Sequence, residues 1–438
     1  MIRADGTAEY RFLKEMRGRD AAVDRDVTAA VETILRAVRE RGDEALREFT
    51  AKFDGFAMPA DAGFEVSARA IDEACAAVPA RFLDALGRAA ENIRRYHAHQ
   101  KRESFLVTGA DGVVMGQRVR GLARAGLYVP GGRAAYPSSV LMNAIPAEVA
   151  GVGELVMVTP PGRDGRVNSY ILAAAKVAGV DRVFAVGGAQ AVGALAYGTA
   201  SIPRVDKIVG PGNIYVATAK RLVFGQVDID MIAGPSEILV VADKTADPVY
   251  LAADLMSQAE HDPMAAAVLV TDTEEIAAQT MAELECQMAS LSRKDIIARS
   301  LADYGAAIVC HDVTECVKIA NSIAPEHLEL MVAEPMRWLG SVDNAGSVFL
   351  GRYSPEPLGD YFAGPNHVLP TGGTARFFSP LSVDTFIKKS SFISYTRQAL
   401  EKGRDDIVTL AHAEGLTAHA HSVQVRFAQS EGDEPNGK

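Results

Sequence analysis

The sequence lacks the features that mark membrane, secreted and nucleic-acid-binding proteins. No apolar run reaches the length of a membrane span, and the N-terminal MIRADGTAEYRF has charges where a signal peptide needs an apolar core. The formal charge is −11, and no basic run offsets it, so affinity for a phosphate backbone is not expected. We therefore expect a cytoplasmic protein that binds neither a membrane nor a nucleic acid.

Cysteine is also scarce, which limits the chemistry. Cys75, Cys286, Cys310 and Cys316 show no C-x-x-C spacing, so neither a disulfide framework nor a thiolate zinc site is indicated. None lies in a recognisable nucleophile setting, as a conventional aldehyde dehydrogenase would require. A P-loop is absent too, which excludes the phosphoryl-transfer enzymes built on that motif. We interpret the thiols as buried and inert.

The chain does have apolar residues at two kinds of spacing. Helical spacing predicts a helix from residue 26 to a break at 42–43, a second helix ending near residue 55, and a third over 81–99. His97 and His99 do not share a helical face, and we interpret both as solvated. This first part of the chain contains no obvious catalytic pattern.

After about residue 120, short apolar strands alternate with helices. The expected strands are AGLYVP, ELVMVTP, RVFAVGG and KIVG, followed by SEILVVAD, AAAVLVTD, AAIVC, HLELMV and SVFLG. Such alternation is typical of a parallel, doubly wound sheet. Because the second set of strands follows the first, we predict two such sheets, and 438 residues are enough for two or three domains.

Three glycine-bearing turns follow strands of the first set: YVPGG at Tyr128, VGGAQAVG from Val186 and VGPGNIYVA from Val209. Glycine at a strand-to-helix turn lets backbone N–H groups approach a phosphate at a helix N-terminus. None of the turns is a GxGxxG, so ordinary tight turns explain them equally well. The residues alone leave both interpretations open.

A helix in the second set ends in the polar run SQAEHD. Asp247 and Pro248 open this helix and Pro263 stops it, which places Gln258 and His261 three residues apart near its C-terminal end. Imidazole is the commonest zinc ligand, and such a neighbour can offer a second donor. Glutamine is a weak zinc ligand, however, so the pair alone does not select a metal.

Further candidate ligands and proton acceptors lie downstream, in the Gly- and Pro-rich loop 351–377, in APEHLEL and in AEGLTAHAHSV. They are Glu326, His327, Asp360, Tyr361, Asn366, His367, Glu414, His419 and His421. Glu326 and His327 stand together at the start of an expected strand. A carboxylate beside an imidazole offers two proton acceptors at a strand end, where open α/β sheets commonly place chemistry.

Five motifs in register, GPSEILVVAD, SQAEHD, APEHLEL, GDYFAGPNHVLPT and EGLTAH, closely resemble the histidinol dehydrogenase family over nearly the whole chain. The resemblance implies oxidation of L-histidinol through L-histidinaldehyde to L-histidine, the last steps of histidine biosynthesis, with two NAD reduced per substrate. It also implies two Rossmann-like domains, one inserted in the other, and a homodimer whose subunits share their active sites.

The resemblance divides the chain into an N-terminal segment 1–25, a larger domain of 26–127 and 236–380, an inserted NAD-contacting domain 128–235, and a C-terminal arm 381–438. The arm has few large apolar side chains, and fewer than 60 residues of this kind are not expected to form a core alone. It must therefore dock, and the resemblance places its Glu414 and His419 in the partner's site.

Site roles carry over from the family residue by residue. The NAD contacts fall on Tyr128, Gln190 and Asn213. The ligands of one zinc ion per subunit fall on Gln258, His261, Asp360 and His419. The substrate contacts fall on Ser236, Gln258, His261, His327, Asp360, Glu414 and His419. The proton acceptors are Glu326 and His327; His367 is expected to line the pocket and His421 to be peripheral.

In this scheme His327 takes the hydroxyl proton while NAD accepts the hydride, and Glu326 activates the water that hydrates the aldehyde. Zinc mainly positions the substrate. Two alternatives stay open: a paralogous zinc and NAD dehydrogenase acting on another amino or sulfonated alcohol, and a non-catalytic metal or nucleotide binding protein. A panel of amino alcohols, followed by NADH absorbance, distinguishes all three.

Overall fold

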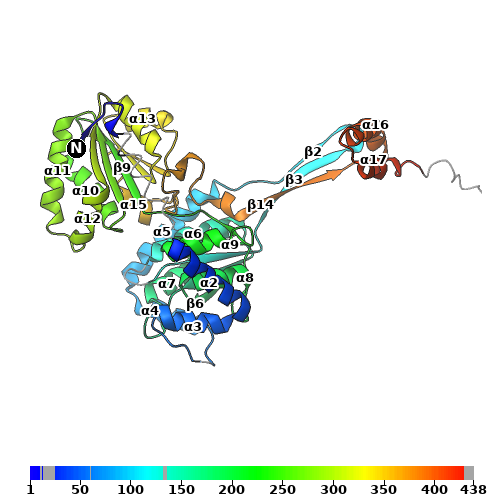
Figure 1. The fold of residues 1–438 in the computed structure, drawn as a ribbon, viewed down its shortest axis with the longest axis horizontal. Helices are drawn as coiled ribbons and strands as arrows, with labels where there is room; N and C mark the ends of the chain where they lie inside the picture. The colour runs from blue at the N-terminus through cyan, green and yellow to red at the C-terminus, as the bar shows by residue number, and fades with distance from the viewer. Residues whose placement is uncertain (10–11, 13–24, 60, 132–135, 429–438) are drawn as a thin grey trace, which may run out of the picture. The chain divides into compact units, whose positions relative to one another are not determined.

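A computed structural model of the chain describes residues 1–9, 12, 25–59, 61–131 and 136–428 (Figure 1). Much of the expected N-terminal segment, and Gly132 of the YVPGG turn, lie outside the described residues. The chain divides into a core unit, residues 1–101 and 121–386, and a tail unit, residues 102–120 and 387–438.

The N-terminal helices have the apolar faces that their sequences predict. They are α2 (Arg25–Arg41), α3 (Asp43–Phe53), α4 (Ala68–Ala77) and α5 (Ala80–Ala98). The prediction that His97 is solvated is wrong, because this residue of α5 is fully buried, with Nδ1 2.9 Å from the carbonyl oxygen of Ile93. Burial lowers the pKa of His97, so the ring is held neutral in the folded core.

The first parallel sheet has the strand order β6-β5-β4-β7-β8. Its strands are β4 (Arg124–Tyr128), β5 (Glu154–Thr159), β6 (Arg182–Ala185), β7 (Lys207–Val209) and β8 (Asp228–Ile229). The helices between them are α6 (Pro137–Ala150), α7 (Ser169–Val177), α8 (Gly188–Tyr197) and α9 (Ile214–Val223). The strand order reverses between β4 and β7, which makes this position the topological switch point.

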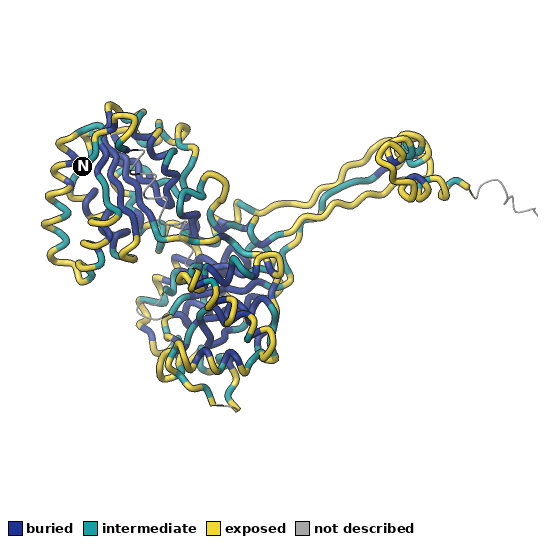
Figure 2. Tube along the Cα trace, in the orientation of Figure 1, coloured by how far each residue is buried: buried dark blue, intermediate teal, exposed yellow. Residues whose placement is uncertain are grey.

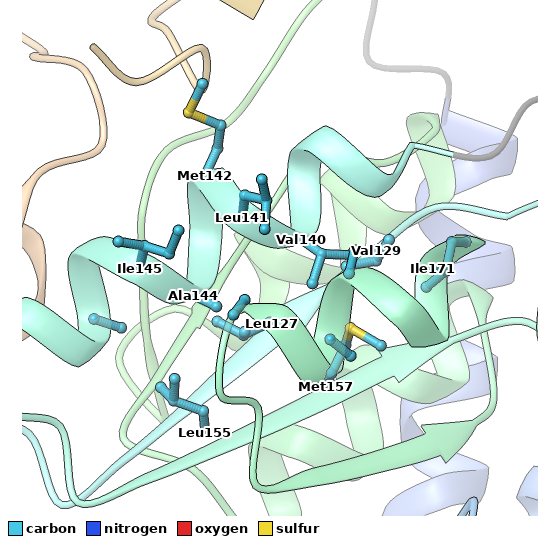
Figure 3. Close-up of a cluster of buried hydrophobic side chains, with 14 of the residues drawn as sticks. Leu127, Val129, Val140, Leu141, Met142, Ala144, Ile145, Leu155, Met157 and Ile171 are labelled. Carbon is cyan, nitrogen blue, oxygen red and sulfur yellow. The ribbon is translucent and has the colours of Figure 1, made fainter. Parts of the chain in front are cut away.

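Helices cover both faces of this sheet. Leu127 and Met157 point to one face, where they pack with Leu141 and Ile145 of α6 (Figure 3). Helix α5 contributes to this cluster, whereas α2 and α3 pack on the opposite face. The resemblance assigned residues 26–127 to the larger domain. In the structure, the buried apolar side chains of the N-terminal helices α2 to α5 belong to the two apolar clusters that cover the faces of this five-stranded sheet.

The second parallel sheet has the order β1-β11-β10-β9-β12-β13. Its strands are β1 (Ile2–Arg3), β9 (Glu237–Ala242), β10 (Ala266–Thr271), β11 (Gly305–Val309), β12 (His327–Met331) and β13 (Ser347–Leu350). In the register of the central strands, Ile238 of β9 lies opposite both Ala267 and His327. Figure 2 shows these central strands as buried.

The helices of this second sheet are α10 (Pro248–Ala259), α11 (Glu274–Met288), α12 (Lys294–Tyr304), α13 (Val313–Ile323) and α14 (Pro335–Trp338). Side chains of α10 and α11 pack on one face of the sheet and those of α13 on the other. The α/β class and the two parallel sheets are therefore confirmed. The insertion of one domain in the other remains a prediction.

Shorter elements complete the core unit: α15 (Glu356–Tyr361) and the 3-10 helices η2 (Leu339–Ser341), η3 (Thr374–Arg376) and η4 (Val383–Phe386). Of the cysteines, Cys310 and Cys316 are buried, but Cys286 is exposed, so the prediction of buried thiols is wrong there. Among the described residues, no helix combines the length and apolarity needed to cross a bilayer.

The tail unit contains a three-stranded sheet of order β14-β3-β2, with β2 (Phe105–Thr108) antiparallel to β3 (Val114–Gly121). It also contains β14 (Ile387–Ser394), η1 (Ala110–Gly112), α16 (Arg397–Ala413) and α17 (Thr417–Gln424). All four residues of β2 are exposed. Residues 102–120 lie far from the expected C-terminal arm in the sequence, yet they form one sheet with its strand β14.

Candidate active site

Three side chains of the core unit bring potential metal ligands together. His261 lies just beyond α10, while Glu356 and Asp360 lie four residues apart on α15, and their ligand atoms are all within 4.8 Å of one another. The side-chain oxygen of Gln258 is buried without a hydrogen-bond partner. An imidazole nitrogen, carboxylate oxygens and an orphaned amide oxygen form a donor set that fits a divalent ion such as zinc.

Helix α10 places two of these side chains. The Asp247 carboxylate caps it by accepting from Val249 N at 3.0 Å, and Pro248 occupies its first turn, as the sequence predicts. The helix ends at Ala259, so His261 lies in the following turn, where its N–H donates to the Gln258 carbonyl at 3.1 Å. The negative end of the helix dipole therefore lies near these ligands and favours a cation.

Helix α15 is anchored by buried polar groups. The N–H of Glu356 donates to Oε1 of Glu329 on β12 at 2.8 Å, and the Ser257 hydroxyl donates to Oε2 of Glu356 at 3.2 Å. Burial is the main reason that the pKa of Glu356 is raised to about 9, and the negative charge of Asp360 adds to this effect. A buried carboxyl thus holds the first turn of the helix that carries Asp360.

The two expected proton acceptors lie at the start of β12, and the backbone N–H and carbonyl of one residue of β9 hold them. The N–H of Glu237 donates to Oε2 of Glu326 at 2.9 Å, while the Glu237 carbonyl oxygen lies 3.0 Å from His327 Nδ1. A carbonyl can only accept, so Nδ1 carries the proton and Nε2 is left as the acceptor. That Nε2 atom is 3.8 Å from Oε1 of Glu356, which links it to the ligand cluster.

Burial sets the protonation of these groups. It lowers the pKa of His327 to about 4, so the imidazole is neutral near pH 7 and able to accept a proton. Burial raises the pKa of Glu326 well above its usual value, which makes its carboxylate a stronger base once ionised. Burial acts to raise the pKa of Asp360 as well, but the hydrogen bond and charge of His367 prevail and lower it to about 2.

The site lies at the amino edge of the second sheet. Ser236 immediately precedes β9, His327 is the first residue of β12, and His261 lies in the connection that leads into β10. Open α/β sheets usually bind ligands at the carboxyl edge. Here α10 runs back across the sheet, so its C-terminal end delivers Gln258 and His261 to the amino edge.

The three expected NAD contacts lie at the carboxyl edge of the first sheet. Tyr128 ends β4, and its hydroxyl accepts from Gly188 N at 3.0 Å, while burial raises its pKa to about 12. Gln190, in the first turn of α8, is buried, and neither its amide oxygen nor its nitrogen has a partner. Asn213 caps α9 by accepting from Tyr215 N and Val216 N. An orphaned amide beside a glycine-bearing helix N-terminus fits a dinucleotide.

The remaining expected site residues are placed as follows. Nδ1 of His367 lies 3.1 Å from the Asp360 carbonyl oxygen, and its Nε2 is 3.3 Å from the Ser139 hydroxyl. Glu414 and His419 belong to the tail unit, at the end of α16 and in α17, and both are exposed there. His421 is exposed as well.

Two features of the candidate site escaped the sequence analysis. Glu356 could have been found, because EPLGD places it four residues before Asp360 on a short helix. The role of Glu237 gave no signal, since it acts through backbone groups that every residue possesses.

Comparisons with known proteins show which family the chain resembles. The family model described as histidinol dehydrogenase matches residues 17–427. A histidinol dehydrogenase of Clostridium acetobutylicum is 53% identical over 423 residues, 97% of each chain, and one of Heliobacterium mobile is 56% identical over 404 residues, 92% of this chain and 94% of that one. The crystal structure of histidinol dehydrogenase from Elizabethkingia anophelis is 40% identical, with a TM-score of 0.88 over 93% of this chain and 94% of that one.

Proposed function

Because this chain belongs to the histidinol dehydrogenase family, we propose that the amino-edge site oxidises L-histidinol through L-histidinaldehyde to L-histidine, with two NAD as hydride acceptors. The observation that carries the proposal is the position of His327. Its Nε2 is buried, belongs to a ring that is neutral near pH 7, and lies 3.8 Å from the Glu356 carboxyl oxygen of the ligand cluster. A proton acceptor thus stands beside the groups that would hold a metal-bound alcohol.

In the first oxidation, His327 Nε2 takes the hydroxyl proton as the carbinol hydride leaves for NAD. Water then adds to the aldehyde, and Glu326 removes a proton from that water. A second hydride then leaves the hydrate for the second NAD, while a hydroxyl proton of the hydrate passes to His327, which has returned to its neutral form, and the product is the carboxylic acid. The shared anchor on Glu237 keeps both acceptors at one end of β12 for the two steps.

The metal proposal assigns Gln258, His261 and Asp360 as ligands from one subunit, and His419 from its partner, with one zinc per subunit. A bound zinc ion would anchor the imidazole and amino nitrogens of the substrate. Glu356 belongs to the same cluster, and its buried carboxyl can contribute a hydrogen bond there. Ser236, at the start of β9, and Glu414 of the partner subunit complete the proposed substrate contacts.

The dinucleotide proposal places NAD at the carboxyl edge of the first sheet, beside Tyr128, Gln190 and Asn213. The supporting observations are the switch point between β4 and β7 and the orphaned Gln190 amide. We also propose that residues 128–235 form the inserted domain and that the protein is cytoplasmic.

The homodimer proposal rests on the tail unit. Its buried apolar residues, among those described, are Val113, Ala399, Ala411 and Ala420. Large apolar side chains are instead exposed: Phe105, Leu106, Val107, Phe392, Ile393, Leu410 and Leu416. A unit of this size without a core needs a covering surface, and a second copy of the chain is the partner that the family resemblance implies.

Turnover of L-histidinol with NAD, with NADH counted per histidine formed, tests the proposed reaction. Two NADH per histidine are expected from the four-electron oxidation. One NADH, with free aldehyde as product, would contradict the role given to Glu326, and absence of NAD reduction would overturn the assignment. A panel of other amino alcohols and sulfonated alcohols serves as the specificity control.

A further inference from the structure

The turn after β7 is packed against the end of β4. Gly210 has φ +112°, and a Cβ atom there would lie 2.2 Å from the carbonyl oxygen of Tyr128. This close approach occurs at the switch point, where β4 and β7 are neighbours. Three residues further on, Asn213 caps α9. The backbone at Gly210 therefore influences how far apart Tyr128 and Asn213, two of the proposed cofactor contacts, lie.

A buried ion pair holds both hydrogen-bonding groups of Gly210. Lys220 of α9 donates from Nζ to the Gly210 carbonyl at 2.9 Å, and Oδ2 of Asp230 accepts from Gly210 N at 2.8 Å. Lys220 also pairs with Oδ1 of Asp230, which in addition accepts from Met231 N at 2.6 Å. The Lys220 and Asp230 side chains are only 3% and 1% exposed.

Stability alone is a weak reason for this arrangement. Removing two charges from water is costly, and a well-packed apolar pair of similar volume often serves the fold equally well. An apolar pair cannot hydrogen-bond the backbone carbonyl and the backbone N–H of one residue at the same time. The pair thus bonds both backbone groups of a single turn, and that turn lies between the end of β4 and the N-terminus of α9.

We propose that Lys220 and Asp230 are positioning residues for the dinucleotide, which they do not touch. By holding both backbone groups of Gly210, they fix the α9 N-terminus with Asn213 relative to Tyr128 at the end of β4. This inference rests on the proposed NAD site. It predicts that loss of the pair weakens NAD binding and leaves histidinol binding, at the other sheet, unchanged.

The test compares Lys220→Met, Asp230→Asn and the double variant with wild type. NAD affinity is measured by calorimetry without substrate, and kcat and both KM values by NADH formation. We expect Kd and KM for NAD to rise about tenfold or more, since a hydrogen bond to a charged group is lost. The KM for histidinol stays unchanged. Hydrogen exchange quickens in peptides that cover residues 209–216.

Lys207→Met is the matched control. Lys207 is the first residue of β7, the strand that leads to Gly210, and its Nζ lies 2.7 Å from Asp228 Oδ2. Lys207 hydrogen-bonds the Thr385 carbonyl and not the backbone of Gly210. This variant should keep wild-type affinity for NAD. The double variant removes the unpaired buried charge, so its melting temperature should exceed that of Lys220→Met while its NAD affinity stays low.

Unchanged NAD affinity in Lys220→Met or in the double variant would overturn the positioning role and leave a purely structural ion pair. So would equal increases in the KM values of NAD and histidinol. If the wild type binds NAD but does not oxidise histidinol, the proposed function fails while the affinity comparison still decides the inference. A wild type that binds no NAD would overturn both.

Discussion

Replacement of Glu326 by glutamine is expected to separate the two half-reactions. The glutamine has the same shape, and its side-chain oxygen can still accept from Glu237 N, which now bonds Glu326 at 2.9 Å. The variant loses the ability to take a proton from water. General-base catalysis contributes about 10² to 10⁴ in rate, so oxidation of supplied histidinaldehyde should slow by roughly that factor, or about 2.7–5.4 kcal/mol of barrier.

The first oxidation should change much less. The proton on Nδ1 of His327 is fixed by the Glu237 carbonyl at 3.0 Å, whereas the Glu326 carboxylate is 3.6 Å from that nitrogen. Removing the Glu326 charge therefore leaves the His327 tautomer and orientation in place. We expect the first hydride transfer to slow by less than about tenfold, the loss of about 1.4 kcal/mol of electrostatic support.

Pre-steady-state NADH formation, started with histidinol or with histidinaldehyde, measures the two steps. Glu334→Gln is the control, because Glu334 lies just beyond the other end of β12 with its side chain 72% exposed. It should leave both steps unchanged. If Glu326→Gln impaired only the first hydride transfer, the roles assigned to Glu326 and His327 would be wrong.

Three further predictions concern the metal, the assembly and the pH dependence of stability. His261→Asn should remove bound metal and turnover while the melting temperature stays near wild type, because the residue lies in a turn outside the core; metal analysis and melting check this, and unchanged zinc content or wholesale unfolding would contradict it. His261→Asn and His419→Asn proteins, each inactive, should regain activity when unfolded and refolded together, because a mixed dimer has one intact site; no recovery would mean that each subunit builds its site alone. Asp54→Asn should raise the melting temperature at pH 8 but not at pH 4. Burial raises the pKa of Asp54 from 3.8 to about 6, so the folded state binds more protons than the unfolded chain, and stability falls as pH rises through that window. An equal effect of Asp54→Asn at both pH values would contradict this cause.

Much of the local structure was encoded in short stretches of sequence. Strand and helix alternation after residue 120 predicted both parallel sheets, and Asp247 and Pro248 predicted the start of α10. Periodicity, capping and turn chemistry act between residues a few positions apart, so a single sequence displays them. The pairing of Glu326 with His327 was readable for the same reason.

The tertiary structure decided which distant residues meet. It buried His97, joined residues 102–120 to the C-terminal residues, and brought Glu356 to the ligands by anchoring α15 on Glu329. It also brought Gln258 and His261 to the amino edge, where the candidate proton acceptors begin β12, through the direction in which α10 returns across the sheet. These outcomes depend on long-range register and on backbone groups, as at Glu237, and neither leaves a mark on residue type. The sequence supplied the candidate site residues, and only packing determined which groups hold them in place.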